Sequence, residues 1–298
     1  MDELPVAATW SRMQTFLLVY DTGSARAAAQ ALHVTPPAVS AAVGALEDAL
    51  GAPLLERVGR TLRPTDAGRT FAGYARTMLG MLGEAAASVR EAETGRLRLG
   101  VVATVSEYVL PRLLAGFVQR FPQVDLSVSV LPRDELFARA AEHQVDVVVA
   151  GRPPAGSPLR TRARRDNQLV VVSAPGVEAA TGRWLLTGQG SGTRQAALAL
   201  VAGLESEPPT LTLGTQGAVL AAARAGLGLA LAHEAAVGAD LRTGSLVRVP
   251  WSGVPLLRPW HLCTAASPTP TTELFLDHAT DSERVGEDTF HPRVPLQG

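Results

Sequence analysis

A run of glycines and hydroxyl residues, Gly188-Gln189-Gly190-Ser191-Gly192-Thr193-Arg194, is the segment of this chain best suited to hold a ligand. It lies between a predicted strand and a predicted helix. Glycines let backbone N–H groups approach a ligand, and the N-terminus of a helix favours negative charge. The run lacks the lysine of a P-loop and the spacing of a dinucleotide fingerprint. It predicts either a cradle for a small anion or a tight turn that binds nothing.

Further polar residues stand near the starts of other predicted helices and near a predicted crossover. Hydroxyls at helix starts are capping groups by default, so they bind a ligand only where the backbone leaves them free. With that alternative open, the candidate ligand-binding residues are Thr104, Ser106, Arg152, Ser191, Gly192, Thr193, Thr215 and Gln216.

Arginines at every third position, Arg57, Arg60 and Arg63, indicate a second kind of chemistry near the N-terminus. The residues around them break helices and permit two short strands, which predicts a β-wing. A guanidinium group matches the geometry of a phosphate. These three residues are therefore candidates for phosphate contacts, with a purely structural role as the alternative.

The overall charge gives no general support for nucleic-acid binding, since the formal net charge is -1. Residues 1–64 contain six acids against five arginines, which are Arg12, Arg26, Arg57, Arg60 and Arg63. Phosphate contacts supply most of the non-specific affinity for DNA, so we expect one copy of residues 1–64, here called the head, to bind DNA weakly. Two or more heads on one DNA would raise the effective concentration.

Catalytic and metal-binding patterns are missing from the sequence. The six histidines are scattered, and neither an HExxH nor a GxSxG motif occurs. The single cysteine, Cys263, excludes a disulfide within the chain and a Cys-rich metal site, and we interpret it as a buried thiol. We therefore expect no enzyme, no metal and no cofactor.

Short helices with tight breaks are predicted for residues 11–50. Ser24 caps a helix over Ala25–Leu32, and Thr35 caps another over Pro36–Leu50 that ends at Gly51. Two short helices with a brief turn form the helix-turn-helix pattern. Val39, Val43 and Leu46 fall on the inward face of the second. The candidate DNA-binding residues are Ser24, Thr35, Pro36, Pro37, Ser40, Arg57, Arg60 and Arg63.

A long helix is predicted from Thr65-Asp66 to about Ala92, where Thr94-Gly95 ends it as a hinge. Its apolar residues form a stripe too broad for a lone helix in water. We therefore expect self-association along a seam of Phe71, Tyr74, Met78 and Met81.

Strands alternating with helices follow from Leu97 to Ala232, which favours parallel sheets with helices on their faces. The stretch from about Ser282 lacks periodicity and is predicted to be a disordered tail. The chain has 298 residues, of which 46% are hydrophobic, enough for two or three domains. No apolar run of 18 residues and no signal-type N-terminus occur, so we expect a cytoplasmic protein away from the membrane.

Three segments resemble the LysR family of bacterial transcription regulators. They are SARAAAQALHVTPPAVSAAVGALEDALGAPLLERVGRTLRPTDAG, GRLRLGVVATVSEYVLPRLLAGFVQRFPQVDLSV and GAVLAAARAGLGLALAHEAAV. The similarity spans about Met13 to Ala279. Within the family, the Gly-Ser-Gly-Thr-Arg run resembles the CbbR-like regulators of carbon-fixation operons.

The resemblance implies an α/β protein with an all-α winged helix-turn-helix head at residues 1–64 and a dimerisation helix at 65–94. Residues 95–298 would form an effector domain of two Rossmann-like lobes, the type 2 periplasmic-binding-protein fold. Lobe I would comprise about 96–164 and 267–281, and lobe II about 165–266. The disordered tail would be 282–298.

The function that the resemblance implies is sequence-specific regulation of transcription. Promoter binding would be modulated by a small anionic metabolite in the cleft between the lobes. The implied partners are double-stranded promoter DNA, this metabolite effector, a second copy of the chain in a homodimer or homotetramer, and RNA polymerase.

Two positions depart from the family pattern. Pro36 stands where a glutamine is common, which puts individual base contacts in doubt, and Leu55 replaces a wing phenylalanine. Two other functions compete with the regulator. A free-standing solute-binding protein would not need the head, and an enzyme of doubly wound type would need a catalytic constellation.

Overall fold

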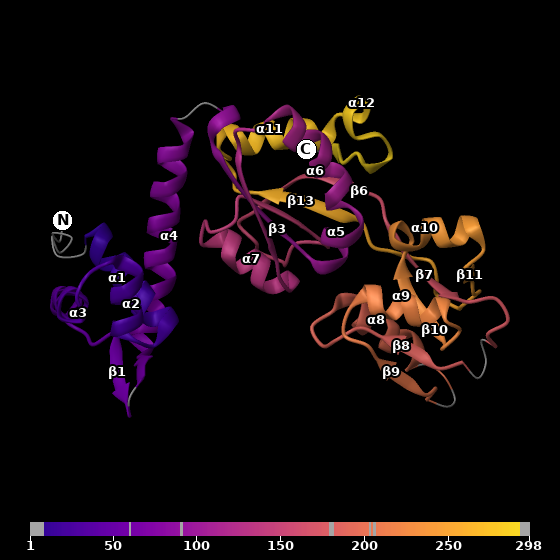
Figure 1. Ribbon diagram of the computed structural model, residues 1–298, viewed down its shortest axis with the longest axis horizontal. Helices are drawn as coiled ribbons and strands as arrows, with labels where there is room; N and C mark the ends of the chain where they lie inside the picture. Colours follow the sequence, from indigo (N-terminus) through magenta and orange to yellow (C-terminus); the bar gives the residue numbers. More distant parts are fainter. Residues whose placement is uncertain are drawn as a thin grey trace. The chain divides into compact units, whose positions relative to one another are not determined.

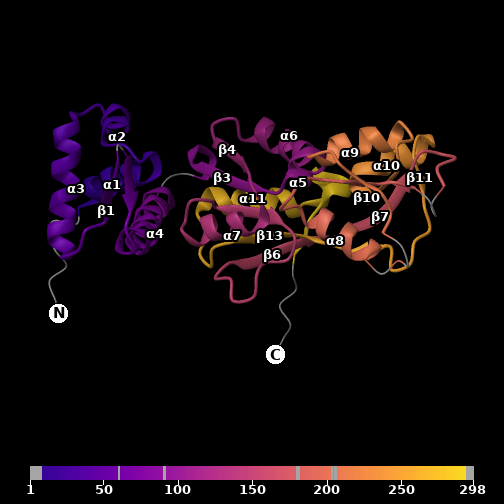
Figure 2. The same ribbon diagram turned by 90° about the horizontal axis from the view of Figure 1, so that it is seen from below.

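The computed structural model describes residues 9–59, 61–89, 92–178, 182–202, 204 and 207–292. The chain divides into two compact units, residues 1–89 with 141–144, and residues 90–140 with 145–298. We call the first the head unit and the second the body (Figures 1 and 2). Over the described residues, no helix is both long and apolar enough to cross a bilayer.

The head unit begins with three helices and a two-stranded wing. The helices are α1 (Trp10–Thr22), α2 (Ala25–Leu32) and α3 (Pro36–Leu50), and the strands are β1 (Leu55–Val58) and β2 (Thr61–Pro64). The structure confirms the predicted bounds of α2 and α3. Ser24 Oγ accepts a hydrogen bond from Ala27 N, and Gly51 ends α3 in the left-handed conformation at φ 67°.

The long helix α4 (Asp66–Ser88) shares a hydrophobic core with this fold. Its Ala72 and Ala75 are fully buried against residues of α1 and α3. At Gly68 a Cβ would lie 2.0 Å from Leu54 O, so only glycine lets α4 approach the backbone just before β1 so closely. The helix ends before the predicted Ala92, and a short 3₁₀ turn, η1 (Ala92–Thr94), follows.

The body contains two lobes, each built on a six-stranded sheet. Lobe I has the strand order β14-β6-β13-β5-β3-β4. The pairings among β4, β3 and β5 are parallel, and the remaining pairings are antiparallel. Its ribbon is both magenta and yellow in Figure 1, because distant parts of the chain build it. The strands are β3 (Arg96–Val101), β4 (Asp125–Val130), β5 (Val147–Ala150), β6 (Arg160–Arg165), β13 (Trp260–Thr264) and β14 (His291–Pro292).

Helices cover both faces of this sheet. One face packs against α6 (Leu110–Arg120) and α11 (Pro270–Thr280), with α5 (Ala103–Tyr108) leading into α6. The other face packs against α7 (Arg133–Ala141).

Lobe II has the order β11-β7-β10-β8-β9, with β12 also paired to β7. The strands are β7 (Gln168–Ser173), β8 (Trp184–Leu186), β9 (Thr210–Thr212), β10 (Leu229–His233), β11 (Val247–Arg248) and β12 (Leu256–Leu257). Helix α8 (Gly192–Val201) covers one face, and α9 (Gln216–Arg224) with α10 (Glu234–Thr243) covers the other. Along β7, Leu169 and Val171 face α8 while Val170 and Val172 face α9 and α10. Burial on both faces explains the unbroken apolar run in the sequence.

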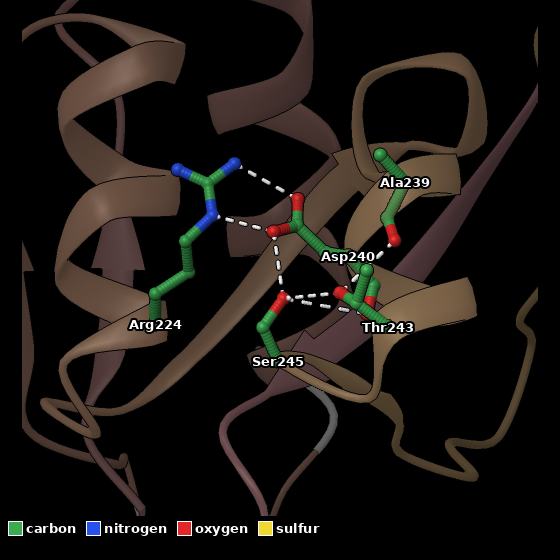
Figure 3. Close-up of polar contacts among 5 residues, drawn as sticks. All are labelled: Arg224, Ala239, Asp240, Thr243 and Ser245. Carbon is green, nitrogen blue, oxygen red and sulfur yellow. Dashed lines mark hydrogen bonds and ion pairs between the residues drawn. The ribbon is translucent and has the colours of Figure 1, made fainter.

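A polar cluster joins the two helices on one face of lobe II (Figure 3). Arg224 on α9 meets Asp240 on α10 through Nε to Oδ1 at 2.7 Å and Nη2 to Oδ2 at 2.8 Å. The same carboxylate accepts a hydrogen bond of 2.9 Å from Ser245 Oγ. These bonds, that to Arg224 foremost, hold the pKa of Asp240 below its ordinary value. The cluster fixes the relative positions of α9 and α10.

Three predictions about the body need correction. The sheets are mixed rather than parallel, because β13 runs antiparallel to both β5 and β6 in lobe I, and β7 runs antiparallel to β10 in lobe II. The chain returns to lobe I at Trp260, since β13 belongs to that sheet, and not at residue 267.

The third correction concerns the predicted disordered tail, because residues 282–292 are structured. They form α12 (Ser282–Val285), η2 (Gly286–Asp288) and β14, which pairs with β6. Phe290 is fully buried, and Asp288 forms ion pairs with Arg112 and Arg165. The segment lacks periodicity because isolated residues anchor it. Residues 293–298 lie outside the described residues.

Candidate functional site

The N-terminal half of α3 presents the residues predicted to contact bases. Thr35, Pro36, Pro37 and Ser40 are exposed, while Val39, Val43 and Leu46 are buried. The Thr35 side chain makes no capping bond, and the first turn of α3 contains no acid. Ser24, by contrast, is half-buried and caps α2. The exposed face can therefore offer two hydroxyls and apolar contacts to a partner.

The wing exposes arginines on both faces of its ribbon. Arg57 is paired in register with Leu62, and Arg63 with Glu56, so the two arginines project to opposite sides. Both are exposed, and neither forms an ion pair with another described residue. Arg60, the third predicted wing arginine, lies outside the described residues. Such a ribbon can present positive charge to a polyanion.

Two of the acids in the head are engaged within the fold. Glu47 Oε1 accepts hydrogen bonds from the backbone N–H groups of Leu54 and Leu55, at 2.7 and 3.0 Å. Asp21 is paired with Arg76 at 2.5 Å. The count of acids against arginines in residues 1–64 therefore overstates the negative charge that this head presents.

The predicted self-association seam on α4 is largely exposed. Tyr74 is 68% exposed, and Met78, Met81 and Leu82 are exposed along the same side of the helix. Phe71 differs from this prediction, because it is half-buried and its ring lies 5.5 Å from that of Phe16 in the head core. The unpartnered line is therefore Tyr74, Met78, Met81 and Leu82.

The body contains a cavity of about 1640 Å³ lined by residues of both lobes. Lobe I contributes the carboxyl ends of β3, β4 and β5, and lobe II contributes the glycine-rich turn before α8. The two crossovers between the lobes complete the wall. Of the predicted residues, the lining includes Thr104, Arg152, Ser191, Gly192 and Thr193.

The glycine-rich turn has the geometry of a helix N-terminus open to the cavity. Gly190 adopts φ 81°, which favours glycine, and Ser191 Oγ caps α8 by accepting from Arg194 N at 3.4 Å. The first backbone N–H groups of a helix have no partner inside it. Those of Gly192 and Thr193 accordingly remain available to a ligand.

Positive charge predominates on the cavity wall. Its described charged residues are Arg133, Arg152, Arg164 and Arg258 against one acid, Asp166. Arg133 is paired with Asp134, and Arg164 with Asp166. Arg152 and Arg258 have no carboxylate partner among the described residues. The cavity is thus suited to an anion.

His233, at the end of β10, joins the cavity to the crossovers. It is 6% exposed, and its ring packs on that of Trp260 with centroids 4.5 Å apart. Its Nδ1 lies 2.7 Å from Asn167 Nδ2, and its Nε2 lies 3.3 Å from Thr193 Oγ1. Burial, together with the charge of Arg258, lowers the pKa of His233 to about 3. The ring is therefore neutral near pH 7.

Three predicted ligand-binding residues do not line the cavity, because the fold itself uses their polar atoms. Ser106 Oγ donates to Ala103 O at 2.7 Å, and Thr215 Oγ1 caps α9 by accepting from Ala218 N. Gln216 is buried, and its Nε2 donates to Leu231 O. Arg194 likewise turns away, to Thr187 O and Thr212 Oγ1.

Sequence reasoning missed the wall residues that come from the crossovers and the C-terminal segment. They are Arg164, Asp166, Arg258, Trp260 and His291. No periodicity marks them, because they lie in the crossovers or near the ends of β6, β13 and β14. His233 had a usable signal, since it ends a buried strand and ligands bind at the carboxyl ends of such strands.

Comparison with known proteins matches both units. Residues 10–69 match the family described as "Bacterial regulatory helix-turn-helix protein, lysR family", and residues 90–284 match "LysR substrate binding domain". The HTH-type transcriptional regulator CfxR of Cupriavidus necator is 32% identical over 88% of this chain and 87% of its own. The RuBisCO operon transcriptional regulator of Allochromatium vinosum is 33% identical over 84% and 88%. These relatives agree with the CbbR-like resemblance of the Gly-Ser-Gly-Thr-Arg run.

Solved structures share the fold. The regulatory domain of CcmR from Synechocystis PCC6803 in complex with 2-PG has a TM-score of 0.54 and 25% identity, covering 61% of this chain and 94% of its own. Full-length CbnR complexed with its target DNA has a TM-score of 0.61 and 22% identity, covering 91% and 98%.

Proposed function

This chain belongs to the LysR family of DNA-binding transcription regulators, which have an effector-binding domain, and we propose that a small anionic metabolite in its body cavity modulates its binding to promoter DNA. The observation that carries this proposal is the cavity wall. Arg152 and Arg258 face the cavity without carboxylate partners, and the N-terminus of α8 opens onto it. The complex of CcmR with 2-PG supports a metabolite ligand.

The proposed effector-binding residues are Thr104, Arg152, Ser191, Gly192 and Thr193. Thr104 belongs to lobe I and Thr193 to lobe II, so a ligand that bonds to both favours a closed arrangement of the lobes. A ligand shifts such an equilibrium only by its difference in affinity for the two states. No cofactor is part of the proposal.

The proposed DNA interface is the exposed face of α3 together with the wing. Thr35, Pro37 and Ser40 meet base edges, while Arg57, Arg60 and Arg63 meet phosphates. Pro36 has no side-chain donor, but a proline can contact a thymine methyl group. Ser24 serves this interface indirectly, as the cap of α2. The complex of CbnR with target DNA supports DNA binding by this chain.

The proposed partners, besides promoter DNA and the effector, are a second copy of the chain and RNA polymerase. Pairing through α4 gives a homodimer, and contacts between bodies would extend it to a homotetramer. The site of action is the cytoplasm, where a bacterial promoter lies.

Calorimetry with a panel of central metabolites tests the effector proposal. We expect phosphorylated or carboxylated metabolites to bind the wild-type protein, and the double variant Thr104→Val with Thr193→Val to bind them less tightly. Ser106→Ala is the matched control, because it removes a hydroxyl of α5 that does not line the cavity. Ligands that are all neutral or cationic, or undiminished anion binding by the double variant, would refute the site.

A further inference from the structure

The ring of His233 is held by an amide whose orientation the surroundings determine. Asn167 Nδ2 lies 2.7 Å from His233 Nδ1 and 2.8 Å from Arg258 O. A carbonyl oxygen accepts and cannot donate, so the atom facing Arg258 O must be the amide nitrogen. A flipped amide would place two oxygens 2.8 Å apart. Asn167 therefore donates one hydrogen to Arg258 O and the other to His233 Nδ1.

This donation decides where the histidine carries its proton. A neutral imidazole has one donor nitrogen and one acceptor nitrogen. Since Nδ1 accepts from Asn167, Nε2 carries the hydrogen. The ring is neutral at physiological pH, because burial and the charge of Arg258 lower its pKa to about 3. Arg258 is the only charged group that lowers it among the described residues, and stacking on Trp260 keeps the ring in place.

The Nε2–H group faces Thr193 Oγ1 at 3.3 Å, so the threonine oxygen is the acceptor of that bond. A hydroxyl group that accepts one hydrogen bond still has its own hydrogen to donate. Thr193 is 8% exposed and lines the cavity at the first turn of α8. Its hydrogen is left to point toward a ligand.

We propose that His233, held by Asn167, is a positioning residue that makes the Thr193 hydroxyl a hydrogen-bond donor, so that the cavity selects ligands presenting an acceptor there. This inference rests on the proposed function and specifies how the site reads its ligand. A phosphate or carboxylate oxygen is accepted, while an ammonium or amide N–H meets a donor and is disfavoured. Because Asn167 also holds Arg258 O, one network joins ligand recognition to both crossovers between the lobes.

The first test determines the protonated nitrogen of His233 by ¹⁵N NMR of the full-length protein, with His233→Gln used to assign the signal. We expect hydrogen on Nε2 and none on Nδ1 at pH 7. Hydrogen on Nδ1 would overturn the proposal, whatever the cavity binds. This readout needs no ligand, so it stands apart from the proposal of an anionic effector.

The second test measures binding of inorganic phosphate to the full-length wild-type protein, three variants and one control variant. A hydrogen bond to a charged ligand increases the affinity roughly tenfold to hundredfold. Thr193→Val and Asn167→Ala should therefore bind phosphate at least tenfold more weakly than the wild-type protein. Thr193→Ser should keep most of the affinity. Gln168→Ala is the control, because Gln168 adjoins Asn167 but donates to Glu234 instead.

Asn167→Ala should also shift the NMR signals toward a mixture of the two neutral forms. Unchanged phosphate affinity in Asn167→Ala, or an equal loss in Gln168→Ala, would contradict the positioning role. If the wild-type protein bound no phosphate at all, the proposal of an anionic effector would be contradicted. The NMR result would still determine which nitrogen of His233 is protonated.

Discussion

At the scale of single residues, the two candidate sites differ in how their polar groups are held. The wing arginines Arg57 and Arg63 are exposed and unpaired among the described residues, so they are free to meet a partner in solution. The cavity instead keeps His233 and Thr193 nearly buried within a fixed network. The first arrangement suits phosphates along a duplex, and the second suits a small ligand of defined shape.

Arg57→Ala should weaken binding both to an operator and to random DNA, because the lost contact is to phosphate. The slope of affinity against salt concentration should fall by about one unit. Ser40→Ala should weaken operator binding while leaving random DNA nearly unchanged. Fluorescence anisotropy at several salt concentrations measures both. Arg284→Ala, which removes an equal charge from the body, is the control. Unaltered binding of Arg57→Ala to random DNA at low salt would show that the wing is not part of the DNA interface.

The protein should lose stability as the pH falls below about 6.5, partly because of His233. The pKa of this group is near 3 when folded and near 6.5 when unfolded, so acid protonates the unfolded chain first. Its stabilising contribution is complete above pH 6.5 and disappears as the pH approaches 3. Between pH 7 and pH 5 the loss should amount to about 2 kcal/mol.

Urea unfolding of the wild-type protein and His233→Gln at both pH values tests this expectation. The variant should show the smaller loss of free energy of unfolding between pH 7 and pH 5. His278, whose pKa burial also lowers, is common to both proteins and cancels in the comparison. Equal losses would show that His233 is not kept neutral by the fold.

The sequence identified residues of the cavity wall where one short motif holds them. Ser191, Gly192 and Thr193 were predicted from a glycine-rich turn and do line the cavity. Thr215 has the same appearance, a hydroxyl before a helix, but the structure uses it only as a cap. The sequence does not distinguish a hydroxyl that caps a helix from one that also faces a cavity, since that depends on the neighbouring lobe.

At the scale of elements, α4 combines two roles in one helix. Its buried side completes the head core through Ala72 and Ala75, while Tyr74, Met78 and Met81 lie exposed on another side. A line of large apolar side chains in water favours association with a matching surface. The same line on a second copy of the chain would satisfy that requirement in an isologous dimer.

Met78→Arg should convert a dimer into monomers, because the charge would be buried without a partner. Analytical ultracentrifugation at micromolar concentration measures the change. Met78→Leu is a suitable control, since it keeps an apolar side chain of similar volume at the same position. A wild-type protein that sediments as a monomer would contradict self-association through this helix.

The C-terminal segment should contribute strongly to the stability of the body. Phe290 is fully buried in the core of lobe I, and removing such a side chain costs roughly 3–5 kcal/mol. Phe290→Ala should therefore lower the urea midpoint of the body, while the neighbouring exposed Glu287→Ala should not. If both variants unfolded like the wild type, residues 282–292 would not be packed as described.

Elements with local signals were predicted closely, and those defined by distant pairing were not. The caps at Ser24 and Gly51 sufficed to predict α2 and α3 to the residue. Strand β6, rich in arginine, pairs with β13 almost a hundred residues later. Short strands of mixed polarity carry no period of their own, so their partners determine them.

At the scale of the whole molecule, function requires communication between two units. A metabolite can influence a promoter only if its binding free energy differs between two arrangements of the protein. The body supplies such a choice, because its cavity is lined by two lobes joined by two crossovers. Coupling of this kind is reciprocal. If DNA changes the affinity for the anion by some factor, the anion changes the affinity for DNA by the same factor.

The most direct test is a quantitative DNase I footprint titration of the full-length protein on a genomic fragment that it retains. It is performed with and without a saturating anion found by calorimetry. We predict that the anion changes the affinity or the extent of the footprint, and that Thr193→Val abolishes the change while binding the DNA normally without anion. Identical protection and identical affinity in both conditions would contradict an effector-modulated regulator.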